Sequence, residues 1–414
     1  MISRNSILPT LLLVIAAVTL VNCAPAVPCN VVGNGAARLH RDTTTNICGN
    51  SGGGGGTPTC SMTLRPNEVV LSVDSKGNIL EYGINSTTGA LTLMCNTATA
   101  AAGPLAVSNN AFLYVLDPTA TPAQVFGFTI AHGNSGALTA IPGSPFPLSE
   151  AIAGNATIVS DSFNRFMFVT NNMGNDVHVL VIGQNGALSE AANSPFVVSR
   201  PDHISSEQTL AYVPDSTDGD IFIFSLDNNG QLVPTIASPL VIGTGNNSPH
   251  FALTDGPFLI TANQASLSTF AIDQNPANGG ALTPGPGSPY SSALAGDPQV
   301  APLTFDLDFT GKFIYVTPAG AAGNIPGFQS DNIIGFAFDG IGGGLTPLPN
   351  SPFVSTSTLD ILRNPTLPLM YVVTSNTNSV LIDAASIDKS GNLTLPTTGL
   401  AVTAVFDPVL ADVQ

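Results

Sequence analysis

One short phrase recurs seven times along this chain. It reads Gly-x-Leu-Thr or a close variant, and its copies begin at Gly89, Gly136, Gly186, Gly230, Gly280, Gly343 and Gly391. The intervals between copies contain short apolar stretches with the alternation typical of β-strands. A period of roughly 40–50 residues with strand-like content is typical of one four-stranded blade per repeat. Seven repeats therefore predict an all-β fold, a seven-bladed β-propeller of four-stranded antiparallel blades.

Each repeat also contains one strongly apolar strand that precedes an alternating strand. The apolar strands are expected at 69–74, 112–117, 166–171, 210–215, 258–263, 313–318 and 369–374. Most of them close on Asp or Asn, which favour turns. Because a closed ring leaves no free sheet edge, we expect the C-terminal segment to complete the first blade.

Five repeats are followed by Ser-Pro and a large apolar residue. These are Ser144-Pro145-Phe146, Ser194-Pro195-Phe196, Ser238-Pro239-Leu240, Ser288-Pro289-Tyr290 and Ser351-Pro352-Phe353. Proline has no N–H to donate to a strand ladder, so it should end the outer strand. The apolar residue is then expected to pack between neighbouring blades.

The net charge argues against nucleic acid as a partner, and the motifs indicate neither a cofactor nor a metal site. The chain has 10 Lys and Arg against 27 Asp and Glu, a net charge of −17, so a nucleic-acid-binding surface is not expected. The glycine run 342–344 lacks the Lys and Ser/Thr of a phosphate loop, and no cofactor is predicted. The acidic run 215–220 does not match EF-hand spacing, and His40, His132 and His178 look isolated. No metal site is therefore predicted.

The N-terminus resembles an export signal. Arg4 precedes an apolar stretch at 7–21 that is short for a membrane span, so residues 1–22 are interpreted as a signal peptide. The sequence Leu20-Val21-Asn22-Cys23 resembles a lipobox and predicts lipidation of Cys23, whereas Ala24-Pro25-Ala26 offers a conventional cleavage site. Residues 23–59 are then a Gly-rich tether and 60–414 the propeller. We expect an exported, monomeric cell-envelope lipoprotein, periplasmic or at the cell surface, that meets the membrane only through its lipid.

Four further cysteines fit an oxidising compartment. Cys29, Cys48, Cys60 and Cys95 are an even number and are expected to form two disulfides, although spacing does not decide the pairing. Their spacing matches no usual zinc finger, which disfavours the rival interpretation.

The repeats resemble the seven-bladed lactonase-type propellers, which include bacterial 6-phosphogluconolactonases, and the related surface propellers with a Tyr-Val-Thr-Asn repeat. The likeness is carried by Phe112-Leu113-Tyr114-Val115, Phe313-Ile314-Tyr315-Val316, Met370-Tyr371-Val372, Phe168-Val169-Thr170-Asn171 and the Gly-x-Leu-Thr turns, over residues 60–414. The resemblance implies a propeller whose ligand lies at the central channel and whose activity is ring-opening of a lactone.

Family lactonases carry histidine and arginine near Pro-His positions, which Pro249-His250 and Pro201-Asp202-His203 match here. This implies His250 and His203 as catalytic candidates, with Arg200, Asp297 and Arg363 as substrate-binding candidates. The alternative is that both histidines only hydrogen-bond a neighbouring blade. The long repeat before Gly343 should place an insertion, 319–332, over the face of the ring that carries His203 and His250. Two functions stay open: an exported lactonase, or a non-catalytic propeller that binds a protein or glycan.

Overall fold

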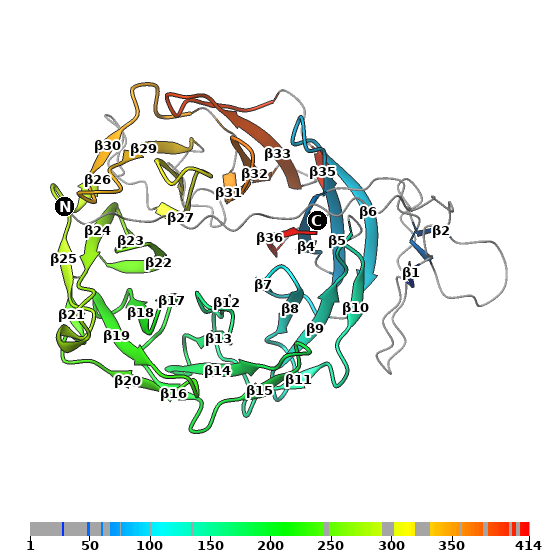
Figure 1. Cartoon of the computed structure of the whole chain (residues 1–414), viewed down its shortest axis with the longest axis horizontal. Coiled ribbons are helices and arrows are strands. Elements are labelled where there is room, and N and C mark those ends of the chain that lie inside the picture. Colours follow the sequence, from blue (N-terminus) through cyan, green and yellow to red (C-terminus); the bar gives the residue numbers. More distant parts are fainter. Residues whose placement is uncertain are drawn as a thin grey trace, which may run out of the picture.

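The computed structural model describes residues 67–413 with internal gaps, and three two-residue strands nearer the N-terminus. The gaps are residues 75, 100, 134–135, 244–247, 292–301, 319–331, 354, 356–357, 376–379, 397–399 and 403–405. Between residues 67 and 413 the strands form seven antiparallel sheets, arranged as blades around a central axis (Figure 1). The predicted seven-bladed β-propeller is confirmed.

Blade 1 is assembled from both ends of the described chain. Its order from the axis outward is β36 (Phe406–Asp412), β4 (Glu68–Val73), β5 (Asn78–Ile84) and β6 (Leu91–Ala98). β36 pairs antiparallel with β4, and Leu410 lies opposite Val70. The prediction that the C-terminal segment completes the first blade is confirmed.

The other blades are each continuous in sequence. Blade 2 contains β7 (Leu105–Ser108), β8 (Phe112–Asp117), β9 (Gln124–Ile130), β10 (Leu138–Ala140) and β11 (Phe146–Pro147). Blade 3 contains β12 (Ile158–Ser160), β13 (Phe166–Asn171), β14 (Asp176–Ile182), β15 (Leu188–Glu190) and β16 (Phe196–Val197). Blade 4 contains β17 (Ser205–Glu207), β18 (Leu210–Asp215), β19 (Asp220–Leu226), β20 (Leu232–Pro234) and β21 (Leu240–Val241).

The second half of the ring repeats this pattern. Blade 5 contains β22 (Pro249–Asp255), β23 (Phe258–Asn263), β24 (Ser266–Ile272), β25 (Leu282–Pro284) and β26 (Tyr290–Ser291), with a 3-10 turn, η2 (Pro276–Asn278). Blade 6 contains β27 (Pro302–Leu307), β28 (Phe313–Pro318), β29 (Ile334–Phe338) and β30 (Leu345–Pro347). Blade 7 contains β31 (Thr358–Arg363), β32 (Leu369–Ser375), β33 (Val380–Ile387), β34 (Leu393–Thr394) and β35 (Leu400–Val402).

A small sheet precedes the ring. β1 (Val27–Pro28) and β2 (Cys48–Gly49) both pair with β3 (Thr59–Cys60), and β3 contacts β6 of blade 1. In the described part of the chain, no helix has the length and apolar character needed to span a membrane.

The core lies between the blades. Each of the seven clusters of buried apolar side chains draws its members from two neighbouring blades of the described structure. The Gly-x-Leu-Thr turns contribute to this contact. Gly186 has φ +79°, and a Cβ built there would lie 2.4 Å from Cδ1 of Phe112, the first residue of β8 in the preceding blade. The repeated glycine is therefore required by close packing between blades as well as by turn geometry.

The expectation that the Ser-Pro residues end the outer strands is wrong: β10 ends at Ala140, and a turn closed by the Ser144 N–H and the Ile141 carbonyl lies between it and Pro145. The serine has a role that the sequence did not suggest. Ser194 Oγ accepts a hydrogen bond of 3.0 Å from the backbone N–H of Val179 on the third strand. The other four serines accept equivalent bonds from the third strands of their own blades. Four of the apolar residues that follow open a short fifth strand in blades 2–5. Every blade thus has the four expected strands, and blades 2–5 add a short fifth strand that pairs with β9, β14, β19 or β24, as β35 pairs with β33 in blade 7.

Candidate functional site

The innermost strands all begin on one face of the ring, here called the start face, and end on the other, the end face. Arg200 and His203 lie on the loop that leads into β17, and His250 lies near the beginning of β22. These three side chains therefore share the start face, on adjacent blades 4 and 5. The register agrees, since Pro249 lies opposite Asn263 at the end of β23.

Asp202 holds the loop that carries the first two of these residues. Its carboxylate accepts hydrogen bonds from Asn172 Nδ2 at 2.6 Å and from the Ser216 backbone N–H at 2.8 Å. Its own backbone N–H donates to the Pro214 carbonyl at 3.1 Å. Because Asn172 belongs to blade 3 and Ser216 to blade 4, the loop is fixed across the blade boundary.

His203 is a neutral, desolvated imidazole. Its ring centroid lies 4.3 Å from that of Phe251, whose ring in turn meets Phe305 edge-on at 5.2 Å. Burial lowers the pKa of His203 to about 4, against the opposing effect of its hydrogen bond to the Ala252 backbone, and the neighbouring His250 lowers it further. Nδ1 is buried and has no hydrogen-bond partner. This atom can accept a hydrogen bond from a buried water molecule.

Arg200 is exposed beside it. Its backbone is left-handed, with φ +35°, and its N–H donates to Asn175 Oδ1 at 3.2 Å. Among the described residues, no carboxylate forms an ion pair with its guanidinium.

Arg363 does not join this group. It is the last residue of β31, opposite Met370, and so lies on the end face. Its backbone N–H donates to Asp306 Oδ2 at 2.9 Å, and its positive charge acts to lower the pKa of Asp306 and of Asp255, although burial raises both.

The expectation that Arg363 lies in one site with His203 and His250 is therefore wrong. The reason is that the turns between the first two strands differ in length from blade to blade. Blade 4 joins its first two strands through residues 208–209, whereas blade 7 uses residues 364–368. His203 and Arg363 lie at similar distances along the chain before the second strand of their blades, β18 and β32. Because the turn in blade 7 is longer, His203 precedes the innermost strand β17, whereas Arg363 is the last residue of the innermost strand β31.

Several predicted features lie outside the described residues. They are Asp297, Cys23, the signal peptide at 1–22 and nearly all of the insertion at 319–332. The ends of that insertion are described: β28 ends at Pro318, opposite Pro302 at the beginning of β27, on the start face. Cys95 is buried on β6 and disulfide-bonded, but the side chains of Cys29, Cys48 and Cys60 are not described, so the pairing stays a prediction.

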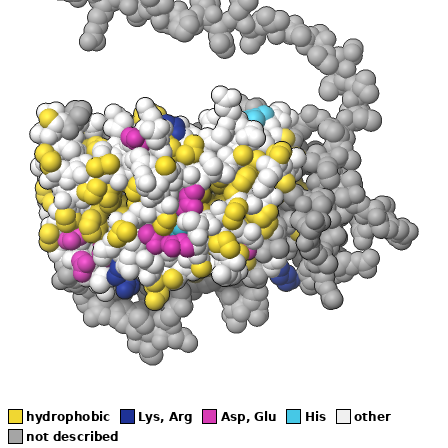
Figure 2. Space-filling model, turned by 90° about the horizontal axis from the view of Figure 1, so that it is seen from below, with side chains coloured by type: hydrophobic (Ala, Val, Ile, Leu, Met, Phe, Trp, Pro, Cys, Tyr) yellow, Lys and Arg dark blue, Asp and Glu magenta, His cyan; other side chains and the backbone are white. Residues whose placement is uncertain are grey.

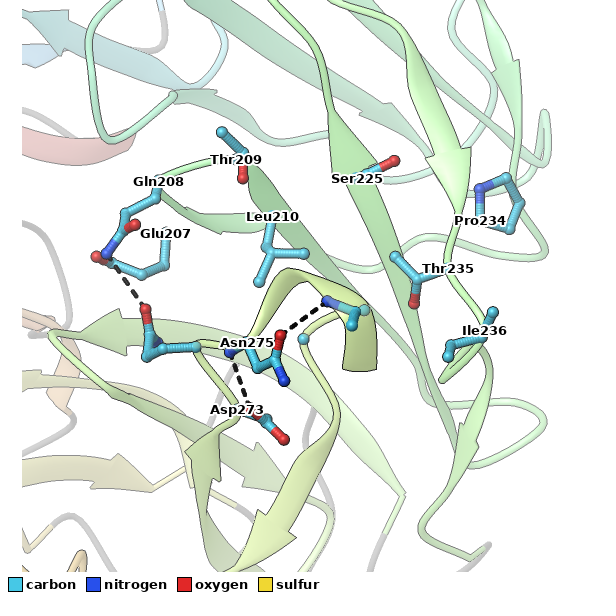
Figure 3. A pocket seen from close by; sticks show the side chains of 14 residues that line it. Glu207, Gln208, Thr209, Leu210, Ser225, Pro234, Thr235, Ile236, Asp273 and Asn275 are labelled. Carbon is cyan, nitrogen blue, oxygen red and sulfur yellow. Dashed lines mark hydrogen bonds between the residues drawn. The ribbon is translucent and has the colours of Figure 1, made fainter.

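The end face carries a groove between blades 4 and 5, with a volume of about 340 Å³. Its walls are the turn at Gln208 and Thr209 on one side and the loop at Asp273 and Asn275 on the other (Figure 3). The Gln208 amide donates to Gln274 at 3.2 Å across the groove. The lining mixes uncharged polar side chains with apolar ones and two acids, Glu207 and Asp273, and it supplies no cation and no histidine.

His178, which looked isolated in the sequence, is fully buried on β14 beside three carboxylates, those of Glu150, Asp176 and Glu190. Sequence reasoning missed this cluster because its members lie on three strands or loops of two blades. The only local signal was an acid two residues from the histidine on the same strand.

Comparison with known proteins agrees with this architecture. The family profile described as Lactonase, 7-bladed beta-propeller matches residues 70–405. The chain belongs to this lactonase family. No curated protein matches the sequence.

Solved structures of similar fold are distant in sequence. A periplasmic gluconolactonase from Pseudomonas aeruginosa is 17% identical, with a TM-score of 0.64, and the match covers 84% of this chain and 100% of that one. A candidate 6-phosphogluconolactonase from Bacteroides fragilis is also 17% identical, with a TM-score of 0.65, covering 85% and 100%. A protein from Lactobacillus plantarum is 19% identical, with a TM-score of 0.63, covering 83% and 99%. At these identities the likeness establishes the lactonase-family fold.

Proposed function

We propose that this lactonase-family propeller hydrolyses a small, uncharged sugar-type lactone outside the cytoplasm. The observation that carries the proposal is the shared position of Arg200, His203 and His250 on the start face of adjacent blades 4 and 5. Two imidazoles from adjacent blades and one exposed guanidinium are the groups that ester hydrolysis needs, a base and a stabiliser of negative charge.

In the proposed reaction His250 acts as the base. It removes a proton from water as the water oxygen attacks the lactone carbonyl carbon. The bond between that carbon and the ring oxygen then breaks, the proton passes from His250 to the ring oxygen, and a hydroxy acid leaves. Arg200 stabilises the negative carbonyl oxygen of the intermediate. His203, with a pKa of about 4, stays neutral at physiological pH, and its ring packs against Phe251 at the base of this site.

The charge of the start face favours an uncharged substrate over a phosphorylated one. Among the described residues, the cations of this face are Arg200 and Lys76, which lies on the turn between β4 and β5 of blade 1. A phosphate group is usually held by several cationic or N–H donors. The periplasmic neighbour supports an extracytoplasmic site of action, and the signal peptide at 1–22 and lipidation of Cys23 remain part of this proposal.

Hydrolysis of glucono-δ-lactone, followed with a pH indicator against the spontaneous rate, tests the proposal. His250→Gln should lower kcat/KM by about 10²–10⁴-fold, the usual contribution of a general base. Lys312→Gln, an exposed change on the end face, should leave the rate unaltered. The proposal fails if neither this lactone nor a panel of other sugar lactones is hydrolysed faster than in buffer, or if His250→Gln matches the unmodified protein.

The alternative function is a non-catalytic module that binds a protein or glycan. The groove between blades 4 and 5 favours it, because side-chain amides and hydroxyls such as those of Gln208, Thr235 and Asn275 line it and can bond carbohydrate hydroxyls. In that case Asn275→Ala would abolish binding to a glycan array, and lactones would not be hydrolysed.

A further inference from the structure

The buried histidine of blade 3 is held in one orientation by a carboxylate. His178 has no exposed surface, and its Nδ1 lies 2.6 Å from Glu190 Oε1. Glu190 is itself fixed by the backbone N–H of Ser149 at 2.9 Å and by the hydroxyls of Ser149 and Ser194, each at 3.1 Å. Ser149 belongs to blade 2, so the carboxylate bridges two blades. A carboxylate that accepts Nδ1–H leaves the lone pair of Nε2 free.

That free nitrogen faces two more carboxylates. Nε2 lies 3.4 Å from Asp176 Oδ1 and 3.8 Å from Glu150 Oε1, and the three atoms all lie within 4.8 Å of one another. Although Nε2 and Asp176 Oδ1 are buried, neither has a hydrogen-bond partner. Burying an unpaired polar atom is costly, so two such atoms that face each other indicate a missing ligand.

We propose that the boundary between blades 2 and 3 binds a divalent transition-metal ion of the zinc type, with Glu150, Asp176 and His178 as ligands. Zinc bonds to nitrogen and oxygen are about 2.0–2.2 Å, which places tetrahedral ligand atoms roughly 3.3–3.6 Å apart. The distances of 3.4 and 3.8 Å from Nε2 are close to this spacing. Glu190 is the positioning residue, in the role that a carboxylate commonly plays behind a metal-bound histidine.

The charges around His178 also favour a bound cation. Three carboxylates surround one imidazole, and no Lys or Arg in the described part of the chain forms an ion pair with any of them. Figure 2 views this side of the ring and shows few basic side chains around a small acidic group. A bound dication would neutralise the cluster. An imidazole ligand favours zinc-type ions over Ca²⁺ or Mg²⁺, which prefer oxygen ligands alone.

The site has an access route and does not depend on the proposed lactonase activity. The side chain of Glu150 is 45% exposed, whereas those of Asp176 and His178 are 9% and 0% exposed. An ion can therefore enter past Glu150, and three protein ligands leave a fourth position for water. Because Glu150 comes from blade 2 and the other ligands from blade 3, the ion would also join the two blades.

Zinc titration of the purified protein by calorimetry, with metal content measured after dialysis, tests this site. The unmodified protein should bind one equivalent more zinc than Glu150→Gln or His178→Gln. Glu150→Gln should weaken affinity at this site at least tenfold, and because its side chain is partly exposed it should fold normally. Glu190→Gln should weaken affinity by about 10–100-fold. His132→Gln, at an exposed histidine, is the matched control and should bind as the unmodified protein does.

The comparison between variants separates this site from zinc bound by cysteines nearer the N-terminus, which these substitutions leave unchanged. The proposal is overturned if Glu150→Gln and His178→Gln retain the full zinc stoichiometry and affinity. It is also overturned if Ca²⁺ raises the melting temperature as strongly as Zn²⁺ does and that rise disappears in Glu150→Gln.

Discussion

The hydroxyl of Tyr371 donates a hydrogen bond of 3.2 Å to the backbone carbonyl of Gly89, across the boundary where blade 7 meets blade 1. Tyr114, Tyr212 and Tyr315 make the same contact with Gly186, Gly280 and Gly391 of the following blade, at 2.8, 3.4 and 2.8 Å. The glycines of these four repeats thus provide a carbonyl to the neighbouring blade as well as space for its side chains.

Removing one of these hydroxyls should weaken the ring at a defined boundary. Tyr371→Phe leaves the buried Gly89 carbonyl without this partner, and the free energy of unfolding should fall by about 1–3 kcal/mol. Urea unfolding measures the loss. Tyr290→Phe is the control, since the Tyr290 hydroxyl bonds to Pro286 within its own blade. An equal loss in both variants would contradict the special role of the boundary contact.

The glycine of the repeat offers a second, closely matched test. Gly186 and Gly133 have φ +79° and +78°, but a Cβ at Gly133 would meet nothing within 4 Å, whereas one at Gly186 would collide with Phe112. Both Gly→Ala changes incur the left-handed backbone cost, and Gly186→Ala should cost about 1–3 kcal/mol more through overpacking. Thermal unfolding of the two variants should differ accordingly, and equal melting temperatures would refute the packing argument.

A buried carboxyl should make stability depend on pH. Burial raises the pKa of Glu81 from 4.5 to about 8, opposed by the Thr97 hydroxyl that donates to it. A raised pKa means that the folded chain binds this proton more tightly than the unfolded chain. The contribution of Glu81 to stability is therefore greatest below pH 4.5 and is lost as the pH rises to 8.

The substitution Glu81→Gln keeps the shape of the side chain but removes its titratable carboxyl group. The variant should gain stability over the unmodified protein as the pH rises from 5 to 8.5, measured by urea unfolding at each pH. A constant difference across that range would show that Glu81 does not titrate as described.

The two arginines that were predicted to bind substrate should differ in their effect on activity. Arg200→Gln, on the start face, should lower kcat/KM for lactone hydrolysis about tenfold or more, because it removes the charge that stabilises the intermediate. Arg363→Gln, on the end face, should leave kcat/KM within about twofold while changing stability, since it removes the cation near Asp306. Equal losses of activity in the two variants would contradict this prediction and indicate that Arg363 takes part in substrate binding.

The strands that could be placed from sequence are those with the strongest local signal. The ranges predicted at 112–117, 166–171, 210–215, 258–263 and 313–318 coincide with β8, β13, β18, β23 and β28. These second strands are buried on both faces, which makes their sequences continuously apolar. Four of these five strands end on Asp or Asn, which favour a following turn, and the number of repeats predicted the number of blades.

Features that depend on contacts between blades could not be placed in this way. The short fifth strands have only two or three residues, too few to show a period. Arg363 was misplaced because spacing along the chain does not reveal how many residues a turn uses. The His178 cluster was missed because Glu150 reaches it only once blades 2 and 3 pack together.

The pairing of β36 with β4 also sets an order of events. Blades 2–7 are continuous, so each can form as soon as its own segment is synthesised. Blade 1 has to wait for the last described strand of the chain. Until then β4 presents an open edge of unpaired N–H and C=O groups, the kind of edge that pairs with other chains. A chaperone or partner that guards this one strand would protect the newly made protein until the ring closes.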